Sequence, residues 1–480
     1  MDLREMDRII LNELDEGLVK DSKTKISTHE ARSPIHTVYG GAHLFKADTP
    51  RKLGRIALKS IETYAPNFVE FADAMWLKGA DTLPRYADVI RNLEFQIADN
   101  PEKIKLENEN AWLAWTIYER TIEKLSREPI EDFRIDFEDG YGFRTDEDED
   151  ADAVSASSEL AKSFLENTIT AFCGFRIKSF APETFERATR TLDLFLTNFI
   201  EKTGGRLPEN FVVTLPKITR KDEVKELRKR LERFEAENNL AEGAVKIEIM
   251  IETPQSIVSQ KGKIALGNLV EAGKGRVVAA HFGAFDYTAS LGISGAHQHL
   301  RHEACNFARQ MMLISLSPLR IRLSDSVTTE MPIPIHKGEN LSENESKENK
   351  YVIHRAWRAH FNNVTHSLIN GFYQSWDLHP AQLAARYAAV YAFFLEAKEG
   401  QAARLKNFIE KATRAATTGN VFDDAASAQG LLNFFVRALN CGALTENEIL
   451  DATTLSAAEI ASASFQQIME NRRAAGAKLV

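Results

Sequence analysis

Two carboxylates lie at the ends of runs of β-branched and small residues. Glu252 ends the run 246–252, and Asp286 comes shortly after the run 276–283. They lie about one βα unit apart in the sequence. Parallel strands end at the same edge of a sheet, so the two side chains are expected to converge there. Two carboxylates, with water and substrate oxygens in the remaining positions, are how proteins usually hold Mg²⁺. The alternative is that both residues merely cap the helices that follow.

Charged residues also share one face of the run 133–140, where Arg134, Asp136 and Glu138 alternate with apolar neighbours. Successive side chains of a strand point to opposite faces, so these three point the same way. Charges turned into a protein interior are costly unless they are paired or functional. The pattern therefore predicts either an internal ion-pair network or part of a site.

Single cations end the next two runs. Arg176 follows Phe175, and Lys217 follows Pro216. A guanidinium at a strand end can hold a carboxylate with two parallel hydrogen bonds. The other interpretation makes Arg176 a structural ion-pair partner or a surface residue, and Lys217 is open in the same way.

These residues need a scaffold in which many strands end together. Short β-branched runs alternate with helical patterns, which is typical of βα units and a parallel sheet. Eight such runs suit a closed (β/α)₈ barrel, whose active sites lie at the carboxyl ends of the strands. The expected strands are 36–41, 133–140, 172–177, 211–217, 246–252, 276–283, 320–325 and 371–374.

Three stretches depart from this alternation. Residues 53–130 show helical spacing, which predicts a helical insertion beside the barrel rather than a further barrel strand. The acidic tract 145–150 is interpreted as a loop that feeds acids into a helix N-terminus, and 337–350 as an exposed polar loop. The Ala-rich chain from about 400 onward predicts a C-terminal helical appendage. The expected domains are an N-terminal helical segment (1–35), the barrel with its insertion (36–399) and the appendage (400–480).

Composition narrows the class of protein. Hydrophobic residues make up 44% of the chain and charged residues 27%, which is ordinary for a folded soluble protein. A formal net charge of −9 argues against nucleic-acid and anionic-membrane partners. Three widely spaced cysteines and a charged N-terminus without an apolar core favour a reduced, cytoplasmic setting. No stretch approaches the roughly 20 apolar residues of a membrane span.

Taken together, the motifs resemble the citrate lyase β-subunit/HpcH–HpaI aldolase superfamily, whose barrels bind pyruvate or phosphoenolpyruvate. Six motifs occur in the family's order. They are Ile135-Asp136-Phe137-Glu138-Asp139, Phe175-Arg176-Ile177, Pro216-Lys217, Ile251-Glu252-Thr253, Gly283-Ala284-Phe285-Asp286, and Gly371-Phe372 with His379-Pro380-Ala381-Gln382. More narrowly, the chain resembles an uncharacterised bacterial aldolase-like branch of this superfamily. It departs from the family in its greater length and in the 53–130 insertion.

The resemblance implies roles for these residues. Glu252 and Asp286 become the Mg²⁺ ligands. Arg176 becomes both a catalytic residue and the ligand of the substrate carboxylate or of the enolate oxygen. The substrate-binding set also takes in Lys217, Gly283 and Ala284. Acid–base or supporting roles near the metal fall to Asp136, Glu138 and Asp139.

Two later segments have weaker assignments. His379 is interpreted as fixing a turn. In related lyases a C-terminal segment of a neighbouring subunit supplies an Asp, and Phe422-Asp423-Asp424 lies in a comparable position.

The expected function is that of a Mg²⁺-dependent carbon–carbon lyase or aldolase that works through a metal-stabilised enolate. Its substrate would be a small carboxylate such as a 2-oxo acid, or a coenzyme A thioester, and the protein would be a homo-oligomer. Two rival functions stay open at this point. One is a phosphoenolpyruvate-dependent phosphotransferase, although no nucleotide-binding glycine loop stands out. The other is a non-catalytic barrel that only binds a metabolite.

Overall fold

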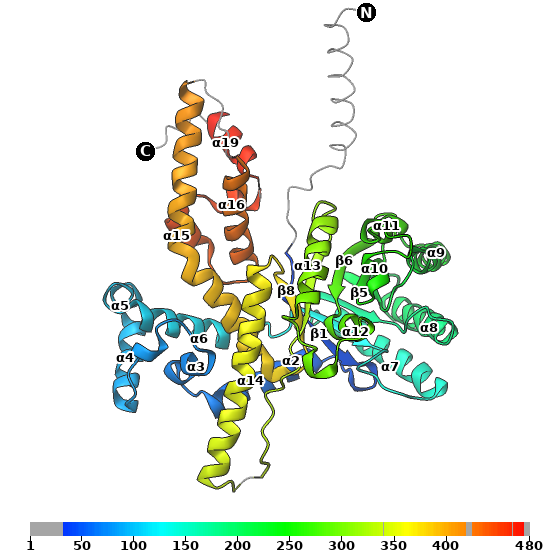
Figure 1. Cartoon of the computed structure of the whole chain (residues 1–480), viewed down its shortest axis with the longest axis horizontal. Helices are drawn as coiled ribbons and strands as arrows, with labels where there is room; N and C mark the ends of the chain where they lie inside the picture. The colour runs from blue at the N-terminus through cyan, green and yellow to red at the C-terminus, as the bar shows by residue number, and fades with distance from the viewer. Residues whose placement is uncertain (1–31, 339, 419–424, 463, 475–480) are drawn as a thin grey trace, which may run out of the picture. The chain divides into compact units, whose positions relative to one another are not determined.

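The computed structural model describes residues 32–338, 340–418, 425–462 and 464–474. Residues 34–396 form one compact unit, and the described residues from 397 onward belong to another. Within the first unit, eight parallel strands close into a barrel in sequence order (Figure 1). The strands are β1 (His36–Gly41), β2 (Asp132–Asp136), β3 (Phe172–Arg176), β4 (Phe211–Leu215), β5 (Lys246–Ile251), β6 (Val277–Phe282), β7 (Arg322–Val327) and β8 (Gln374–Asp377).

Helices follow the strands in the alternation that the sequence predicts, which confirms the (β/α)₈ barrel. Their amphipathic faces are buried. Phe195 and Phe199 of the helix after β3, for example, are fully covered. The helices are α7 (Asp146–Leu165), α8 (Phe185–Thr203), α9 (Lys221–Glu237), α10 (Pro254–Ile257), α11 (Leu266–Ala272), α12 (Ala284–Ser290), α13 (Glu303–Leu316), α14 (Glu343–Ile369) and α15 (Leu383–Thr418), with short 3₁₀ turns η1 (Ala42–Leu44), η3 (Gly295–His297) and η4 (Pro380–Gln382).

The last two strands begin later than their sequence patterns suggested. The expected strand 371–374 was wrong, because Gly371 has a φ of 84° and ends the α14 segment in a turn, so β8 starts only at Gln374. Arg320 likewise has a φ of 57°, and β7 runs from Arg322 to Val327. Apolar residues next to a turn read like strand in a sequence, and only the left-handed backbone separates the two.

The insertion between β1 and β2 is helical, and the closed sheet contains only β1 to β8. Asn67, Asn100 and Asn108 begin three of its helices by accepting backbone N–H bonds with their side chains. The first helix packs on η4, next to the end of β8. The elements are α2 (Thr49–Tyr64), α3 (Phe68–Met75), η2 (Ala80–Thr82), α4 (Ala87–Asp99), α5 (Pro101–Glu107) and α6 (Glu109–Arg127) (Figure 1).

Two loop predictions had different outcomes. The acids of 146–149 occupy the first turn of α7 behind the N-cap Thr145, as expected for a helix N-terminus. The polar stretch 337–350 is not all loop, because α14 begins at Glu343. Ser342 and Glu345 form a reciprocal capping box there, a helix start signal that the polar composition concealed.

The described residues from 397 onward form helices joined by short turns, which confirms the predicted helical appendage. After α15 come α16 (Ala425–Asn440), α17 (Glu446–Thr453), α18 (Ala457–Ala461) and α19 (Phe465–Ala474). Phe422, Asp423 and Asp424 lie outside the described residues, as does most of the expected N-terminal segment. No helix in the described part of the chain combines the length and apolar character needed to cross a membrane.

Candidate active site

A cavity of about 650 Å³ opens at the carboxyl ends of the barrel strands. A volume of this order is typical of small-molecule sites. Its charged lining comes from four different βα connections and brings together Asp136, Asp139, Arg176, Glu252 and Asp286. The barrel therefore gathers residues that are up to 150 positions apart in the sequence, from 136 to 286.

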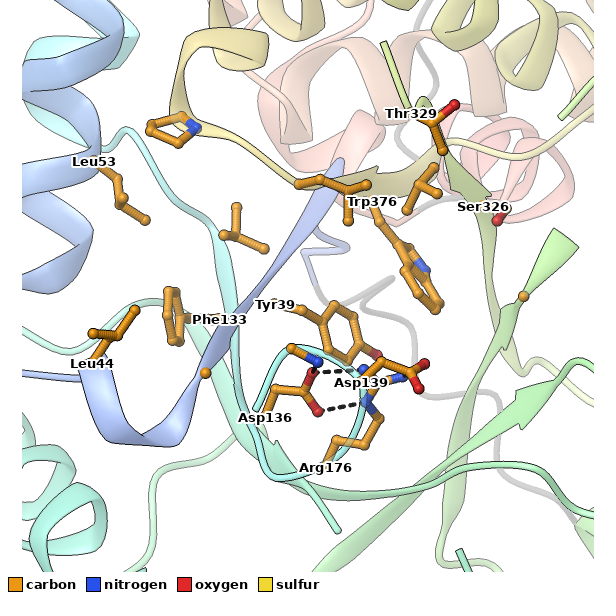
Figure 2. Close-up of a pocket in the computed structure, with 18 of the residues that line it drawn as sticks. Tyr39, Leu44, Leu53, Phe133, Asp136, Asp139, Arg176, Ser326, Thr329 and Trp376 are labelled. Carbon is orange, nitrogen blue, oxygen red and sulfur yellow. Dashed lines mark hydrogen bonds and ion pairs between the residues drawn. The ribbon is translucent and has the colours of Figure 1, made fainter. Parts of the chain in front are cut away.

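Arg176 lies at the centre of this charged group. Its Nε and Nη2 donate to the two carboxylate oxygens of Asp136 at 2.7 and 2.6 Å (Figure 2). Its Nη1 lies 3.0 Å from Glu138 Oε2, and its guanidinium carbon lies 4.7 Å from the ring centre of Tyr39. Only 3% of Arg176 is exposed. Arg176 thus lines the cavity, as a substrate clamp requires, and is also a structural ion-pair partner.

Asp136 is saturated by hydrogen bonds from the protein. Besides the two bonds from Arg176, it accepts the backbone N–H groups of Glu138 at 3.1 Å and Gly140 at 2.7 Å. Gly140 is needed for this close approach, because a Cβ there would lie 2.7 Å from Asp136 Oδ2. This arrangement suits Asp136 to hold Arg176 in place rather than to exchange protons with a substrate.

Lys217 bridges the acidic loop after β2 and the end of β5. Its Nζ is ion-paired with Glu138 and with Asp139, the latter at 2.9 Å. Its backbone has a φ of 51°, a conformation that residues other than glycine rarely adopt. In that conformation its N–H donates to Glu252 Oε1 at 2.6 Å. Lys217 therefore supports three carboxylates, and direct contact with a substrate stays a prediction.

Glu252 is a buried carboxylate without a paired cation among the described side chains. It is 2% exposed, and its hydrogen bond comes from the Lys217 amide. Burial, together with the charges of Glu138 and Asp286, raises its pKa to about 8. Thr253, not Glu252, caps the helix α10, so the capping alternative does not apply to Glu252.

Asp286 faces the same cavity from the first turn of α12. This position also benefits from the helix dipole, so its capping interpretation stays open. Among the described residues, no cluster of three or more His, Cys, Asp or Glu side chains is arranged as a metal site. Two carboxylates alone nevertheless match the usual protein contribution to a Mg²⁺ site. A buried, unpaired carboxylate beside a second acid fits a divalent cation, because the cation would offset their repulsion.

The backbone of Gly283 and Ala284 is already hydrogen-bonded within the barrel. Gly283 N–H donates to Ile251 O at 3.0 Å, and Ala284 N–H donates to Ser326 Oγ at 3.0 Å. Gly283 lines the cavity, and a Cβ there would lie 2.5 Å from Glu252 Oε2. Its lack of a side chain thus makes room for Glu252. Substrate binding by Gly283 and Ala284 stays a prediction.

A buried polar network lies below the mouth and explains Arg134. Its Nε and Nη2 donate to Glu248 at 3.0 and 2.7 Å, and it is also ion-paired with Asp132. Thr214 donates to the same Glu248 at 2.7 Å. The expected strand 133–140 is shorter in the structure, because β2 ends at Asp136 and Glu138 lies in the loop that follows. Arg134 belongs to the internal network, whereas Asp136 and Glu138 lie at the site.

The floor between this network and the mouth contains residues that the sequence did not single out. Tyr39 OH lies 3.2 Å from His281 Nδ1 and 3.3 Å from Glu248 Oε1, and its ring packs 4.7 Å from that of Trp376. Burial and the charge of Glu248 raise the pKa of Tyr39 well above its usual value. Tyr39 lies two residues before Gly41, and His281 lies two residues before Gly283. Because side chains alternate between the two faces of a strand, this spacing could have indicated that both side chains point into the barrel.

His379 acts at a turn, as its interpretation from sequence expected. Its Nδ1 accepts the Ala381 N–H at 3.2 Å and begins η4, while Gln382 donates to Thr328 O at 2.9 Å. This His-Pro segment fixes the connection after β8.

Comparisons with known proteins place the chain in a family. The family model described as "Domain of unknown function (DUF6986)" matches residues 24–468, so the chain belongs to that family. A search of curated proteins finds no significant match.

Solved structures with a similar fold include a citrate lyase from Burkholderia xenovorans LB400. It has 18% identity and a TM-score of 0.48, over 70% of this chain and 92% of that one. Another is the magnesium/glyoxylate complex of Haloferax volcanii malate synthase. It has 14% identity and a TM-score of 0.44, over 93% of this chain and 94% of that one.

Proposed function

We propose that this member of the DUF6986 family is a Mg²⁺-dependent carbon–carbon lyase or aldolase that acts on a carboxylated carbonyl compound. The observation that carries the proposal is the charge of the cavity mouth. Five carboxylates meet there (Asp136, Glu138, Asp139, Glu252 and Asp286), against the two cations Arg176 and Lys217. An anionic substrate would be repelled from such a mouth unless a cation bound with it.

Glu252 and Asp286 are the residues that would hold the metal. Their carboxylates are the oxygen ligands that Mg²⁺ prefers, and the Lys217 amide fixes one oxygen of Glu252. When bound, Mg²⁺ would act as a Lewis acid that stabilises negative charge on a carbonyl oxygen, by several kcal/mol.

Arg176 would supply a second, fixed positive charge for the carboxylate or the enolate oxygen. Although burial lowers its pKa, Asp136 and Glu138 raise the pKa of Arg176 well above its usual value, so it stays charged. Because Asp136 occupies its Nε and Nη2 edge, a substrate carboxylate would meet Nη1 in place of Glu138. A donor that is already oriented does not need to reorganise during the reaction.

Asp139 is the carboxylate that we assign to proton transfer. It lines the cavity, and 54% of its side chain is exposed, whereas Asp136 and Glu138 are enclosed by donors. From there it would take the proton of a hydroxyl group during cleavage, or of an α-carbon during condensation. Tyr39 and Trp376 close the floor below and keep bulk water from the reacting carbons.

The test is a Mg²⁺-supplemented screen of 2-oxo acids, 3-hydroxyacyl thioesters and aldehydes, with products identified by mass spectrometry. Turnover that is lost in Glu252→Gln and Asp286→Asn, and kept in Glu223→Gln on the outer helix α9, would support the proposal. Phosphate transfer from phosphoenolpyruvate would favour the phosphotransferase alternative. Binding without turnover over the whole panel would favour a non-catalytic barrel. Use of coenzyme A and homo-oligomer formation stay predictions.

A further inference from the structure

The cavity has a second, apolar part that the proposed chemistry does not use. Beyond the charged mouth it extends over the end of β1 toward η1 and the insertion helix α2. We call this part the outer lobe. Its apolar side chains are Val38, Leu44, Phe45, Leu53, Phe133 and Leu378.

The outer lobe and the charged mouth lie on opposite sides of β1. Leu44, Leu53 and Phe133 are on one side of the strand, and Asp136, Asp139 and Arg176 are on the other (Figure 2). The end of β1 that separates them carries no side chains, because it consists of Gly40 and Gly41. A Cβ on Gly40 would lie 2.7 Å from the Phe133 ring, so a side chain there would intrude on the lobe. One ligand can therefore span both parts.

The lobe offers few hydrogen-bonding partners to a polar group of a ligand. None of its lining side chains is charged, and the hydroxyl of Thr49 already accepts the Lys46 N–H at 2.9 Å. Two of its apolar side chains stay in contact with water, since Leu44 is 70% exposed and Leu378 is 37% exposed. An apolar ligand group that covered them would remove this apolar surface from water, which is favourable.

We propose that the outer lobe binds an apolar arm of the substrate. The substrate class is then a carboxylated carbonyl compound that carries an aliphatic or aromatic chain of several carbons, not a bare three-carbon 2-oxo acid. This inference rests on the proposed function for the position of the carboxylate end. It also gives the insertion a role, because Leu53 of α2 forms one wall of the lobe.

Binding of N-alkyl oxamates, measured by calorimetry with the full-length protein and Mg²⁺, tests the proposal. These compounds mimic a 2-oxo acid and carry an arm of chosen length, from none to hexyl. The dissociation constant is expected to fall roughly twofold to fourfold for each methylene that enters the lobe. Leu44→Asn and Leu53→Asn should weaken the binding of N-hexyl oxamate by about tenfold and leave the affinity for oxamate unchanged. Leu106→Asn, at an insertion residue that is 89% exposed, is the matched control.

The possible failures are distinguishable. Oxamate binding with no dependence on arm length would overturn the outer-lobe proposal and leave the proposed function standing. A length dependence that persists without Mg²⁺ and in Glu252→Gln would support the lobe but contradict the metal site. If none of the compounds binds, both proposals fail. If Leu44→Asn converts an oligomer into a smaller species in sedimentation, a second copy of the chain covers the lobe, and the substrate-arm proposal is wrong.

Discussion

Arg176 and Asp136 are direct neighbours in the barrel and share a two-pronged ion pair. They are register partners at the ends of β3 and β2, and the two hydrogen bonds measure 2.7 and 2.6 Å. Both side chains are almost fully buried. The pair fixes the guanidinium plane and leaves Nη1 directed at the acidic loop. A single interaction therefore serves both stability and the orientation of the site.

Arg176→Lys is expected to impair activity and stability together. Lysine keeps the charge but loses the planar fork, so Asp136 keeps only part of its partners. Turnover should fall by about two orders of magnitude or more, as when one oriented donor is removed from a site. The free energy of unfolding should fall by about 1–3 kcal/mol. Kinetics and denaturant melts measure the two effects.

Arg190→Lys is the matched control for this variant, because Nε and Nη2 of the exposed Arg190 donate to the two carboxylate oxygens of Asp150. It should change neither turnover nor the free energy of unfolding appreciably, since exposed ion pairs contribute little to stability. If Arg176→Lys melts early but keeps wild-type turnover, Arg176 is a structural residue only.

Metal binding is expected to depend on Glu252 and Asp286. Glu252→Gln or Asp286→Asn should weaken Mg²⁺ at least about tenfold, which corresponds to about 1.4 kcal/mol. The fold should persist in Glu252→Gln, because removing the charge also relieves repulsion from Glu138 and Asp286. Calorimetric titration with MgCl₂ measures the affinity, and circular dichroism checks the fold. Unchanged affinity in both variants would show that the cation, if bound, lies elsewhere.

Gly283→Ala tests the packing of the same carboxylate without altering any charge. The added Cβ would lie 2.5 Å from Glu252 Oε2, so the carboxylate must move. We expect weaker Mg²⁺ binding, with a loss of unfolding free energy of roughly 1–3 kcal/mol from overpacking. Gly267→Ala is the control, since a Cβ there meets nothing within 4 Å. Wild-type Mg²⁺ affinity in Gly283→Ala would mean that this position of Glu252 is not the metal-binding one.

Glu235 is expected to make stability depend on acid pH. It lies on α9, and both its oxygens accept from Arg276 at 2.6 and 2.7 Å. The Val245 and Gly243 N–H groups donate to it at 2.9 Å each. Burial alone would raise its pKa, but these bonds outweigh burial and lower it.

A lowered folded-state pKa stabilises the protein above the unfolded value of about 4.3, and this contribution is lost as pH falls through the folded-state pKa. Glu235→Gln should therefore cost about 3 kcal/mol at pH 7. The gap to wild type should narrow below about pH 4.

Glu223 on the same helix should make stability depend on pH in the opposite direction. Burial raises the pKa of Glu223, although the hydrogen bonds from Thr219 lower it in part. Its contribution is present below the unfolded pKa and is lost as pH rises through the raised folded-state value. Urea melts of both Gln variants across acid pH measure these trends. A constant gap between wild type and Glu235→Gln would contradict the assignment.

The sequence by itself determined the barrel and which residues end its strands. Alternation on β5 puts Glu248 and Met250 opposite three isoleucines, and this period of two identifies a strand with a polar inner face. Glu252 follows β5 directly, and Asp286 lies four residues after the end of β6, so their place at the rim is a matter of chain geometry. Strand boundaries were less certain, as β8 shows, because turns such as that at Gly371 depend on backbone dihedral angles.

Only the tertiary structure decided how these charges are paired. Arg134 and Asp136 share one face of β2, yet Arg134 joins Glu248 across the barrel while Asp136 binds Arg176 of the adjacent strand. Partner choice depends on the depth of each residue along the barrel axis, which follows from strand stagger and not from local spacing. The outer lobe shows the same limit, because Leu53 of the insertion and Phe133 of β2 line one cavity only in the folded barrel. The local sequence pattern specifies which face of its strand each residue occupies, and the closed sheet specifies which other residues it contacts.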